Sequence, residues 1–199
     1  MKNMINAISI GLVATAIPVV SGIHWLSSNN DTEQTPSSVE EVVEVPKTWI
    51  CPECTPEEQY VLKELQRGTK IKDRNALATI LGNIKQESKF IANICEGGAR
   101  VPYTDCHRGG YGIIQWTSKS RYLGLGNFAS KYGCDPSTLE CQTRYMINEN
   151  IFVRVLPDFE GSGQTVAKYM IPAYYWLGWG IRGPRDTYAY DFTKQMILS

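Results

Sequence analysis

The chain has 199 residues, of which 20% are charged, and its formal net charge is zero. This length fits one catalytic domain with appendages, and the charge balance argues against non-specific nucleic-acid binding, which requires an excess of basic side chains. The zero conceals an asymmetry, because residues 1–46 carry one lysine and five acids while residues 47–199 carry 19 basic and 15 acidic residues. The net positive charge of residues 47–199 suits an anionic polymer such as a cell wall.

The first feature in chain order is an uncharged apolar segment. Residues 5–25 contain no Asp, Glu, Lys or Arg, and at about 1.5 Å per residue such a run can just span a bilayer as a helix. Lys2 precedes it, and Val19-Val20-Ser21-Gly22 offers small residues for cleavage. We therefore predict a signal peptide or an uncleaved membrane anchor over residues 1–26, with a helix buried against a partner as the alternative. Both leading interpretations export the rest of the chain.

Residues 27–50 are rich in Ser, Asn, Thr, Glu and Pro. Such a composition cannot bury enough apolar surface to fold alone, so we expect an acidic, flexible linker. The globular domain is then predicted to occupy residues 51–199.

All six cysteines follow the linker, and an even number in an exported domain suggests disulfides. The local pairing Cys95–Cys106 and Cys134–Cys141 would close two short loops. Cys51 and Cys54 would pair with each other or stay reduced. Two other uses of these two cysteines are weaker: a structural zinc lacks a second close cysteine pair, and a redox motif lacks a βαβ context. We expect no metal and no organic cofactor.

The domain begins with two predicted helices. Thr55-Pro56-Glu57-Glu58 combines a capping residue, a proline at the first helical position and a capping box, and this helix should stop at Gly68. Asp73 should cap a second helix that ends near Ser88. Small residues should keep one side of the second helix thin, so that another helix can approach closely: Ala76, Ala78 and Gly82.

The apolar face of the second helix leads to a carboxyl group. Leucine and isoleucine recur at helical spacing up to Ile84, and Glu87 follows three residues later on the same face. Desolvation disfavours the charged form of a carboxyl group, and a carboxyl that stays protonated can act as a general acid. The alternative is a glutamate at a helix end that reaches solvent or caps a neighbouring backbone.

The spacing of apolar residues and the helix caps along the rest of the domain predict a mostly α domain of about six helices. Residues 90–110 should form a loop or a small hairpin, followed by helices that start at Thr117 or Ser118 and at Asp135-Pro136. Val155-Leu156-Pro157 should break the helical pattern. Residues 166–177 should form a core helix, residues 178–184 a loop that could close a cleft, and Asp186 should cap a final helix through Met196.

Two short motifs connect this helical pattern to a family. Gln86-Glu87-Ser88, followed by Gly110-Tyr111-Gly112-Ile113-Ile114-Gln115-Trp116-Thr117, resembles the phage tail lysozyme family and is similar to goose-type lysozymes and lytic transglycosylases. In these enzymes a Glu-Ser pair closes a helix and a Gly-x-x-Gln segment lines the sugar cleft. The resemblance covers roughly residues 73–150. Lys89-Phe90-Ile91-Ala92 departs from the Gly-x-x-Pro that the family usually has after Glu-Ser, so the turn after the helix should differ.

The resemblance implies a lysozyme-like helical domain that cleaves the β-1,4 bond between N-acetylmuramic acid and N-acetylglucosamine in peptidoglycan, with Glu87 as general acid. Glu96 or Asp105, in the loop, would place water or stabilise charge, although each can equally be a solvated loop acid. Glycan contacts would come from Tyr111, Gly112, Gln115 and Trp116, while Tyr145 lies on a helix that backs the cleft. From chemistry alone, Trp116 is better explained as core.

Two alternatives remain beside a hydrolase. A lytic transglycosylase would cleave the same bond to give a 1,6-anhydro product and would need no second carboxylate. An inactive relative would be a wall-binding module. The resemblance further implies a phage-encoded enzyme, acting at entry from a virion tail or at lysis, and the predicted export signal fits lysis or an envelope-anchored enzyme.

Overall fold

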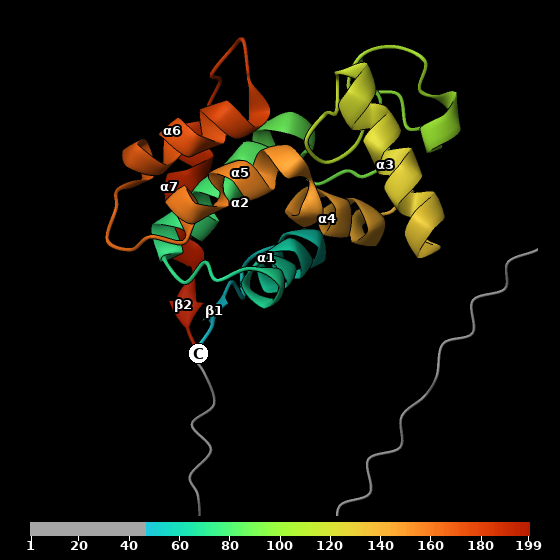
Figure 1. Ribbon diagram of the computed structural model, residues 1–199. Helices are drawn as coiled ribbons and strands as arrows, with labels where there is room; N and C mark the ends of the chain where they lie inside the picture. The colour runs from blue at the N-terminus through green and yellow to red at the C-terminus, as the bar shows by residue number, and fades with distance from the viewer. Residues whose placement is uncertain (1–46) are drawn as a thin grey trace, which may run out of the picture. The chain divides into compact units, whose positions relative to one another are not determined.

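The computed structural model describes residues 47–199, which form seven α-helices, one 3-10 turn and two very short strands. Their bounds are β1 Trp49–Ile50, α1 Pro56–Gly68, α2 Arg74–Ser88, η1 Tyr103–Asp105, α3 Lys119–Tyr132, α4 Leu139–Asn148, α5 Asn150–Phe159, α6 Val166–Leu177, α7 Arg185–Gln195 and β2 Ile197–Leu198 (Figure 1). The mostly α class is confirmed. Within the described part, no helix combines the length and apolarity needed to cross a membrane. The predicted segment 1–26 and most of the predicted linker lie outside the described residues.

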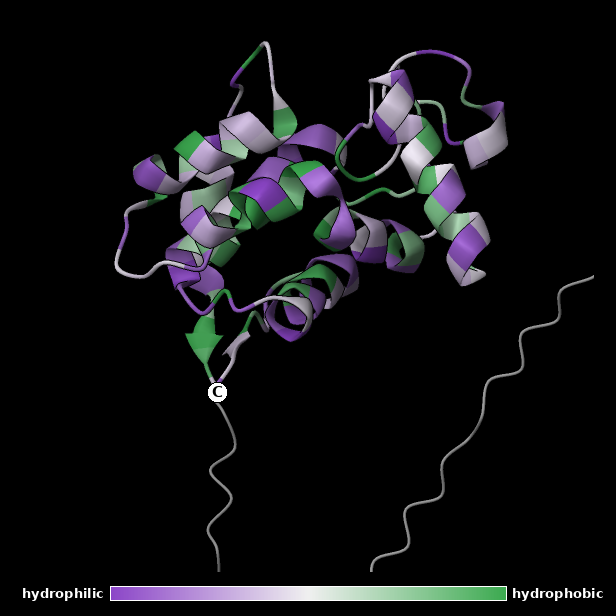
Figure 2. Ribbon diagram, viewed as in Figure 1, coloured by the Kyte–Doolittle hydropathy of each residue, from purple (hydrophilic) through white to green (hydrophobic). Residues whose placement is uncertain are grey.

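Helix α2 is the central element of the domain. Its residues from Ala76 to Ile84 are all buried, and α1, α6 and α7 pack against it (Figure 1). Figure 2 shows hydrophobic and hydrophilic residues alternating along the surrounding helices, as expected for elements with one buried face. The predicted close approach of another helix is confirmed at Gly82, where a Cβ would lie 2.6 Å from the backbone nitrogen of Ala189 in α7.

The first two helices begin at their predicted caps. The Thr55 side chain accepts from the Glu58 amide and Glu58 accepts from the Thr55 amide, which is the capping box expected from the sequence. The Asp73 side chain accepts from the amides of Asn75 and Ala76 at the start of α2. Local side-chain chemistry therefore fixes where these helices start.

The predicted break at Pro157 is wrong, because Pro157 lies inside α5. A proline there removes one hydrogen bond, to the carbonyl of Val153 four residues earlier. The Val153 side chain is 48% exposed, so this stretch of the helix faces water. The opposite face buries Phe152, Val155 and Phe159, and burial of three large apolar side chains outweighs the loss of one solvent-facing hydrogen bond.

Two predicted helix starts are also wrong. Helix α4 begins at Leu139 with Thr138 as its cap, because the Asp135 side chain accepts from the Ser137 amide and forms a turn instead. Asp186 does not cap α7; it accepts two hydrogen bonds from Arg182, and this contact lowers the pKa of the Asp186 carboxyl group.

The two ends of the described domain meet in a small antiparallel sheet. Trp49 pairs with Leu198 and Ile50 with Ile197. The sequence assigns Trp49 and Ile50 to the linker, but they belong to the folded part. In the predicted hairpin region, isolated bridges join Ile94 to Arg100 and Cys95 to Tyr111 without forming named strands. The local disulfide pairing is confirmed: Cys95–Cys106 and Cys134–Cys141 are bonded, and Cys51 is bonded to Cys54.

Candidate active site

The chain leaves α2 through two consecutive left-handed residues. Lys89 has φ 51° and Phe90 has φ 63°, a conformation that glycine adopts more readily than other residues. The Phe90 ring is buried and packs edge-on against Phe192 of α7, with 6.2 Å between ring centroids. The turn after α2 is therefore made by two residues other than glycine, the second of which is anchored in the core.

Ser88 connects the end of α2 to the glycine-containing segment. Its hydroxyl donates to the carbonyl of Ile113 over 2.8 Å and is buried. A serine at this position therefore fixes residues 112–115 beside the last turn of α2. This contact brings together the Glu-Ser motif and the Gly-x-x-Gln motif, across a sequence separation of 25 residues.

Glu87 occupies the turn of α2 that precedes this contact. Its side chain is 17% exposed, and its Oε1 accepts from Nη2 of Arg185 over 2.6 Å. The partial burial agrees with the prediction, whereas the arginine partner was not predicted.

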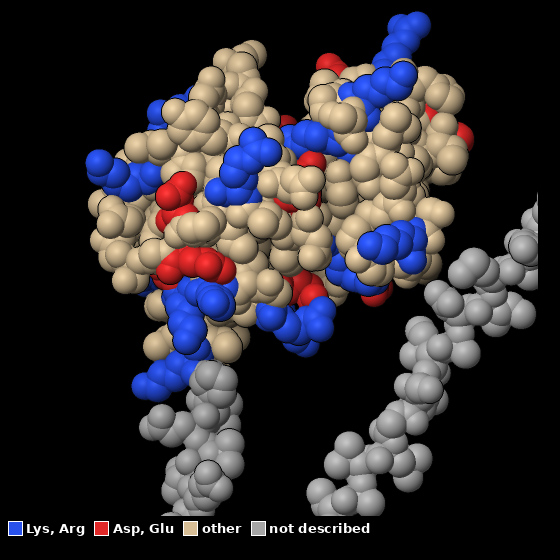
Figure 3. Space-filling model, viewed as in Figure 1, with Lys and Arg blue, Asp and Glu red and all other residues tan. Residues whose placement is uncertain are grey.

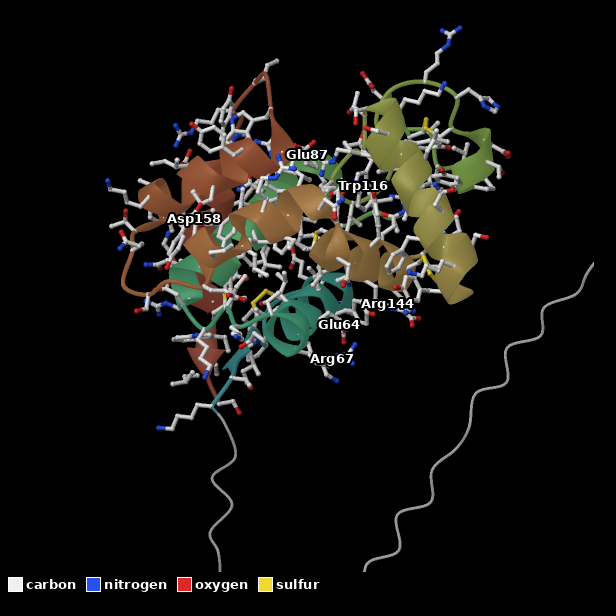
Figure 4. All side chains as sticks on the ribbon, in the orientation of Figure 1. Glu64, Arg67, Glu87, Trp116, Arg144 and Asp158 are labelled. Atoms are coloured by element: carbon white, nitrogen blue, oxygen red, sulfur yellow. A yellow bond between two sulfur atoms is a disulfide. The ribbon has the colours of Figure 1, made fainter. Side chains whose placement is uncertain are left out.

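One face of the molecule carries an indentation (Figure 3). Figure 3 shows this indentation between the part of the molecule that carries α6 and α7 and the part that carries α3. In the same view, Figure 4 places Glu87 between these two parts, at the end of α2. The Glu87 side chain, 17% exposed, is partly open to solvent.

The Gly112–Gln115 segment is held by a buried glutamine. Gln142 of α4 accepts from the Ile113 amide over 2.9 Å and donates to the carbonyls of Ala92 and Pro136. Gly112 has φ 77°, and a Cβ there would lie 2.3 Å from the Gln142 side-chain oxygen. The glycine is therefore required by this internal contact as well as by its backbone conformation.

Gln115 itself is half-buried, and its backbone has the left-handed conformation, with φ 51°. Its amide group donates to the Gly112 carbonyl over 3.0 Å and thereby closes the segment on itself. The segment is thus a tight turn with a partly exposed amide.

Three aromatic residues of the predicted glycan site belong to the core. The Tyr111 hydroxyl donates to the carbonyl of Val101, the Trp116 indole donates to Glu149, and the Tyr145 hydroxyl donates to the carbonyl of Arg121. The rings of all three are buried. They belong to the core that supports the segment, as the chemistry of Trp116 alone suggested; Trp116 is labelled in Figure 4.

The two candidate second acids lie in the loop and are exposed. Glu96 accepts from the Gly110 amide over 3.0 Å, and Asp105 accepts from the Thr104 hydroxyl. Within residues 47–199, neither forms a hydrogen bond with Glu87 or with its arginine partner. The structure therefore places Ser88 against the Gly112–Gln115 segment and Glu87 against Arg185, while Glu96 binds Gly110 just before that segment and Asp105 binds Thr104. Across the same residues, no cluster of three or more metal-ligating side chains occurs.

The residues missed from the sequence come from the last quarter of the chain. Arg185 contacts Glu87, and the Trp179 ring lies 4.7 Å from the Arg185 guanidinium. A Cβ on Gly183 would lie 2.9 Å from the Gln86 side chain, so the loop predicted to close a cleft does lie beside the end of α2. No local sequence signal marked Arg185, because its partner is 98 residues away.

Comparison with known proteins gives one match. The sequence profile of the phage tail lysozyme family matches residues 64–169, which is more than half of the chain and includes the Glu87-Ser88 pair and the Gly112–Gln115 segment. No curated protein and no solved structure matches the chain. On this match, which agrees with the helical fold and with the contact between the two motifs, the chain belongs to the phage tail lysozyme family.

Proposed function

We propose that this protein is a phage-encoded glycosidase that cleaves the β-1,4 bond between N-acetylmuramic acid and N-acetylglucosamine in peptidoglycan. Membership of a lysozyme family supports a peptidoglycan-degrading enzyme of the glycosidase type. The finer assignment depends on Glu87 acting as the general acid. Its site of action would be the host cell wall, reached by export or as part of a virion.

One observation carries this proposal: the hydroxyl of Ser88 binds the carbonyl of Ile113 over 2.8 Å. This bond holds the last turn of α2, which carries Glu87, against the turn that contains the half-buried Gln115. An amide can donate to and accept from sugar hydroxyl or acetamido groups. A carboxyl group next to such donors and acceptors can be directed at a glycosidic oxygen.

In the proposed reaction Glu87 gives a proton to the glycosidic oxygen as the bond to the muramic acid C1 breaks. Water then adds to C1. Glu96 or Asp105 would assist this second step only if the loop that carries them closes toward Glu87 when glycan binds.

The engagement of both loop acids elsewhere favours a second candidate, a lytic transglycosylase. Glu96 binds the Gly110 amide and Asp105 binds Thr104, whereas a hydrolase of the inverting type needs a second carboxylate about 6.5–9.5 Å from the acid. In a transglycosylase the muramic acid 6-hydroxyl attacks C1 and takes the place of water. Mass spectrometry of the digested glycan separates reducing ends from 1,6-anhydro ends.

The test is clearing of purified cell wall by the full chain, with the Glu87→Gln variant alongside. We expect clearing by the wild type and a loss of roughly 10²–10⁴-fold in the variant, the range that general acid catalysis supplies. Equal clearing by both proteins would remove Glu87 from the mechanism. A folded wild type that binds wall without clearing it would identify a binding module instead.

A further inference from the structure

We propose that Arg185 is a positioning residue for Glu87 and that it determines which carboxyl oxygen carries the proton used in bond cleavage. This inference rests on the function proposed for Glu87. Arg185 lies beyond residues 64–169, so the family match assigns it no role.

The contacts of Arg185 span one turn of α2. Nη2 donates to Oε1 of Glu87 over 2.6 Å, and Nη1 lies 3.3 Å from both the carbonyl oxygen and the side-chain oxygen of Asn83. Asn83 and Glu87 are four residues apart and therefore lie on the same side of the helix. The two-pronged guanidinium group fits this arrangement, which a lysine could not reproduce.

The surroundings of Arg185 hold its side chain in one place. It is only 4% exposed, Trp179 lies 4.7 Å from its guanidinium, and the backbone that carries it packs against Gly82. Its buried Nε has no hydrogen-bond partner among the described residues. An unpaired buried donor is unfavourable for stability, so its presence here points to a geometric role rather than to a contribution to folding alone.

The ion pair distinguishes the two oxygens of Glu87. Arginine cannot accept a hydrogen bond, so the oxygen that faces Nη2 must be an acceptor whether the carboxyl group is neutral or ionised. Among the hydrogen bonds of residues 47–199, this one alone engages the carboxyl group of Glu87. A proton that Glu87 donates must therefore leave from Oε2, the oxygen left for a substrate.

The same contact assists proton donation. The proton leaves Oε2 for the glycosidic oxygen, the bond from that oxygen to C1 breaks with its electron pair going to oxygen, and the leaving sugar departs with a hydroxyl group. Glu87 becomes a carboxylate whose new charge is stabilised by Nη2 of Arg185. Water or the 6-hydroxyl then adds to C1 and returns a proton to Glu87.

The test measures kcat and KM on solubilised glycan strands, with products quantified by mass spectrometry, for the full-length wild type, Arg185→Met and Arg185→Lys. We expect kcat to fall roughly 10²-fold in Arg185→Met, the cost of a misplaced catalytic group. KM should stay within about twofold of the wild type, because the buried arginine does not reach the substrate. Arg185→Lys should be intermediate, and added guanidinium should recover about tenfold of the kcat lost in Arg185→Met.

The matched control is Arg67→Met, which removes an arginine–glutamate pair on α1 (Figure 4). Its kcat should equal that of the wild type. If Arg185→Met is poorly folded by circular dichroism, Arg185→Lys decides alone. A wild-type kcat in Arg185→Lys, or a raised KM with unchanged kcat, overturns the positioning role. A wild type that releases no product overturns the proposed function and, with it, this inference. An active wild type together with an unaffected Arg185 variant overturns this inference alone.

Discussion

Gly82 is a residue at which α2 and α7 approach each other closely. A Cβ built there would meet the backbone nitrogen of Ala189 at 2.6 Å and the backbone oxygen of Arg185 at 2.9 Å. Both atoms belong to the main chain and cannot rotate away. The absence of a side chain at position 82 therefore determines how closely α7 approaches α2, and with it the position of the arginine that contacts Glu87.

We expect Gly82→Ala to destabilise the protein by about 1–3 kcal/mol, as overpacking does. This cost exceeds the gain of roughly 1 kcal/mol that alanine brings to a helix interior, because α7 must move as a whole. Urea unfolding measures the change, and wall clearing should fall with it. Gly180→Ala is the matched control, since no atom lies within 4 Å of a Cβ there; a similar loss in both variants would contradict this explanation.

At the scale of elements, the loop between α2 and α3 is organised by one covalent link and one buried side chain. The Cys95–Cys106 disulfide closes a loop with a sequence separation of 11 residues, while Gln142 binds the adjoining segment at Ile113. The loop has little regular structure of its own. Its backbone is therefore ordered by these two attachments together with the antiparallel bridges Ile94–Arg100 and Cys95–Tyr111.

Replacing Cys95 and Cys106 together by serine should lower the free energy of unfolding by about 2–3 kcal/mol, the loop-closure contribution of a link of this length. Wall clearing should fall further than this loss of stability accounts for, because the loop supports Gly110 through Glu96. Urea unfolding and the clearing assay, both under oxidising conditions, measure the two effects.

The control pair is Cys134 and Cys141, which joins the end of α3 to the start of α4. Its replacement by serine should destabilise the fold by a similar amount while leaving more activity. Equal activity losses in the two double variants would show that the link at residues 95 and 106 has no special relation to the site.

At the scale of the whole molecule, a half-buried tyrosine on α3 and buried tyrosines on α4 and α6 make stability depend on alkaline pH. Burial raises the pKa of Tyr122, Tyr145 and Tyr169 to about 12, whereas tyrosine in an unfolded chain ionises near about 10. The folded state therefore holds these protons more tightly than the unfolded state. Their contribution to stability is complete below about pH 10 and is lost as pH rises through about 12.

We accordingly expect the free energy of unfolding, measured in urea, to fall steadily between about pH 10 and pH 12. Tyr145→Phe should lower stability at neutral pH, because it removes the hydrogen bond to the Arg121 carbonyl. The same variant should show a shallower decline across the alkaline range, because one buried hydroxyl no longer ionises. A free energy of unfolding that is constant over this range would refute the account.

The sequence alone determined the features that depend on neighbours along the chain. A capping box fixed the start of α1 and the Asp73 side chain that of α2, helical spacing put Glu87 at the end of a buried face, and short separations indicated the Cys95–Cys106 link. The order of the Glu-Ser and Gly-x-x-Gln motifs indicated the family. Each of these rests on interactions within a few residues, or on a pattern readable in one dimension.

Only the tertiary structure decided the features that depend on packing between distant segments. Pro157 lies within a helix because the buried face of α5 outweighs one missing hydrogen bond, and Asp186 binds Arg182 instead of capping α7. The partner of Glu87 comes from 98 residues away. Which charged side chain reaches a buried carboxyl group depends on how closely two helices pack, and that distance depends on the summed contacts of the whole core.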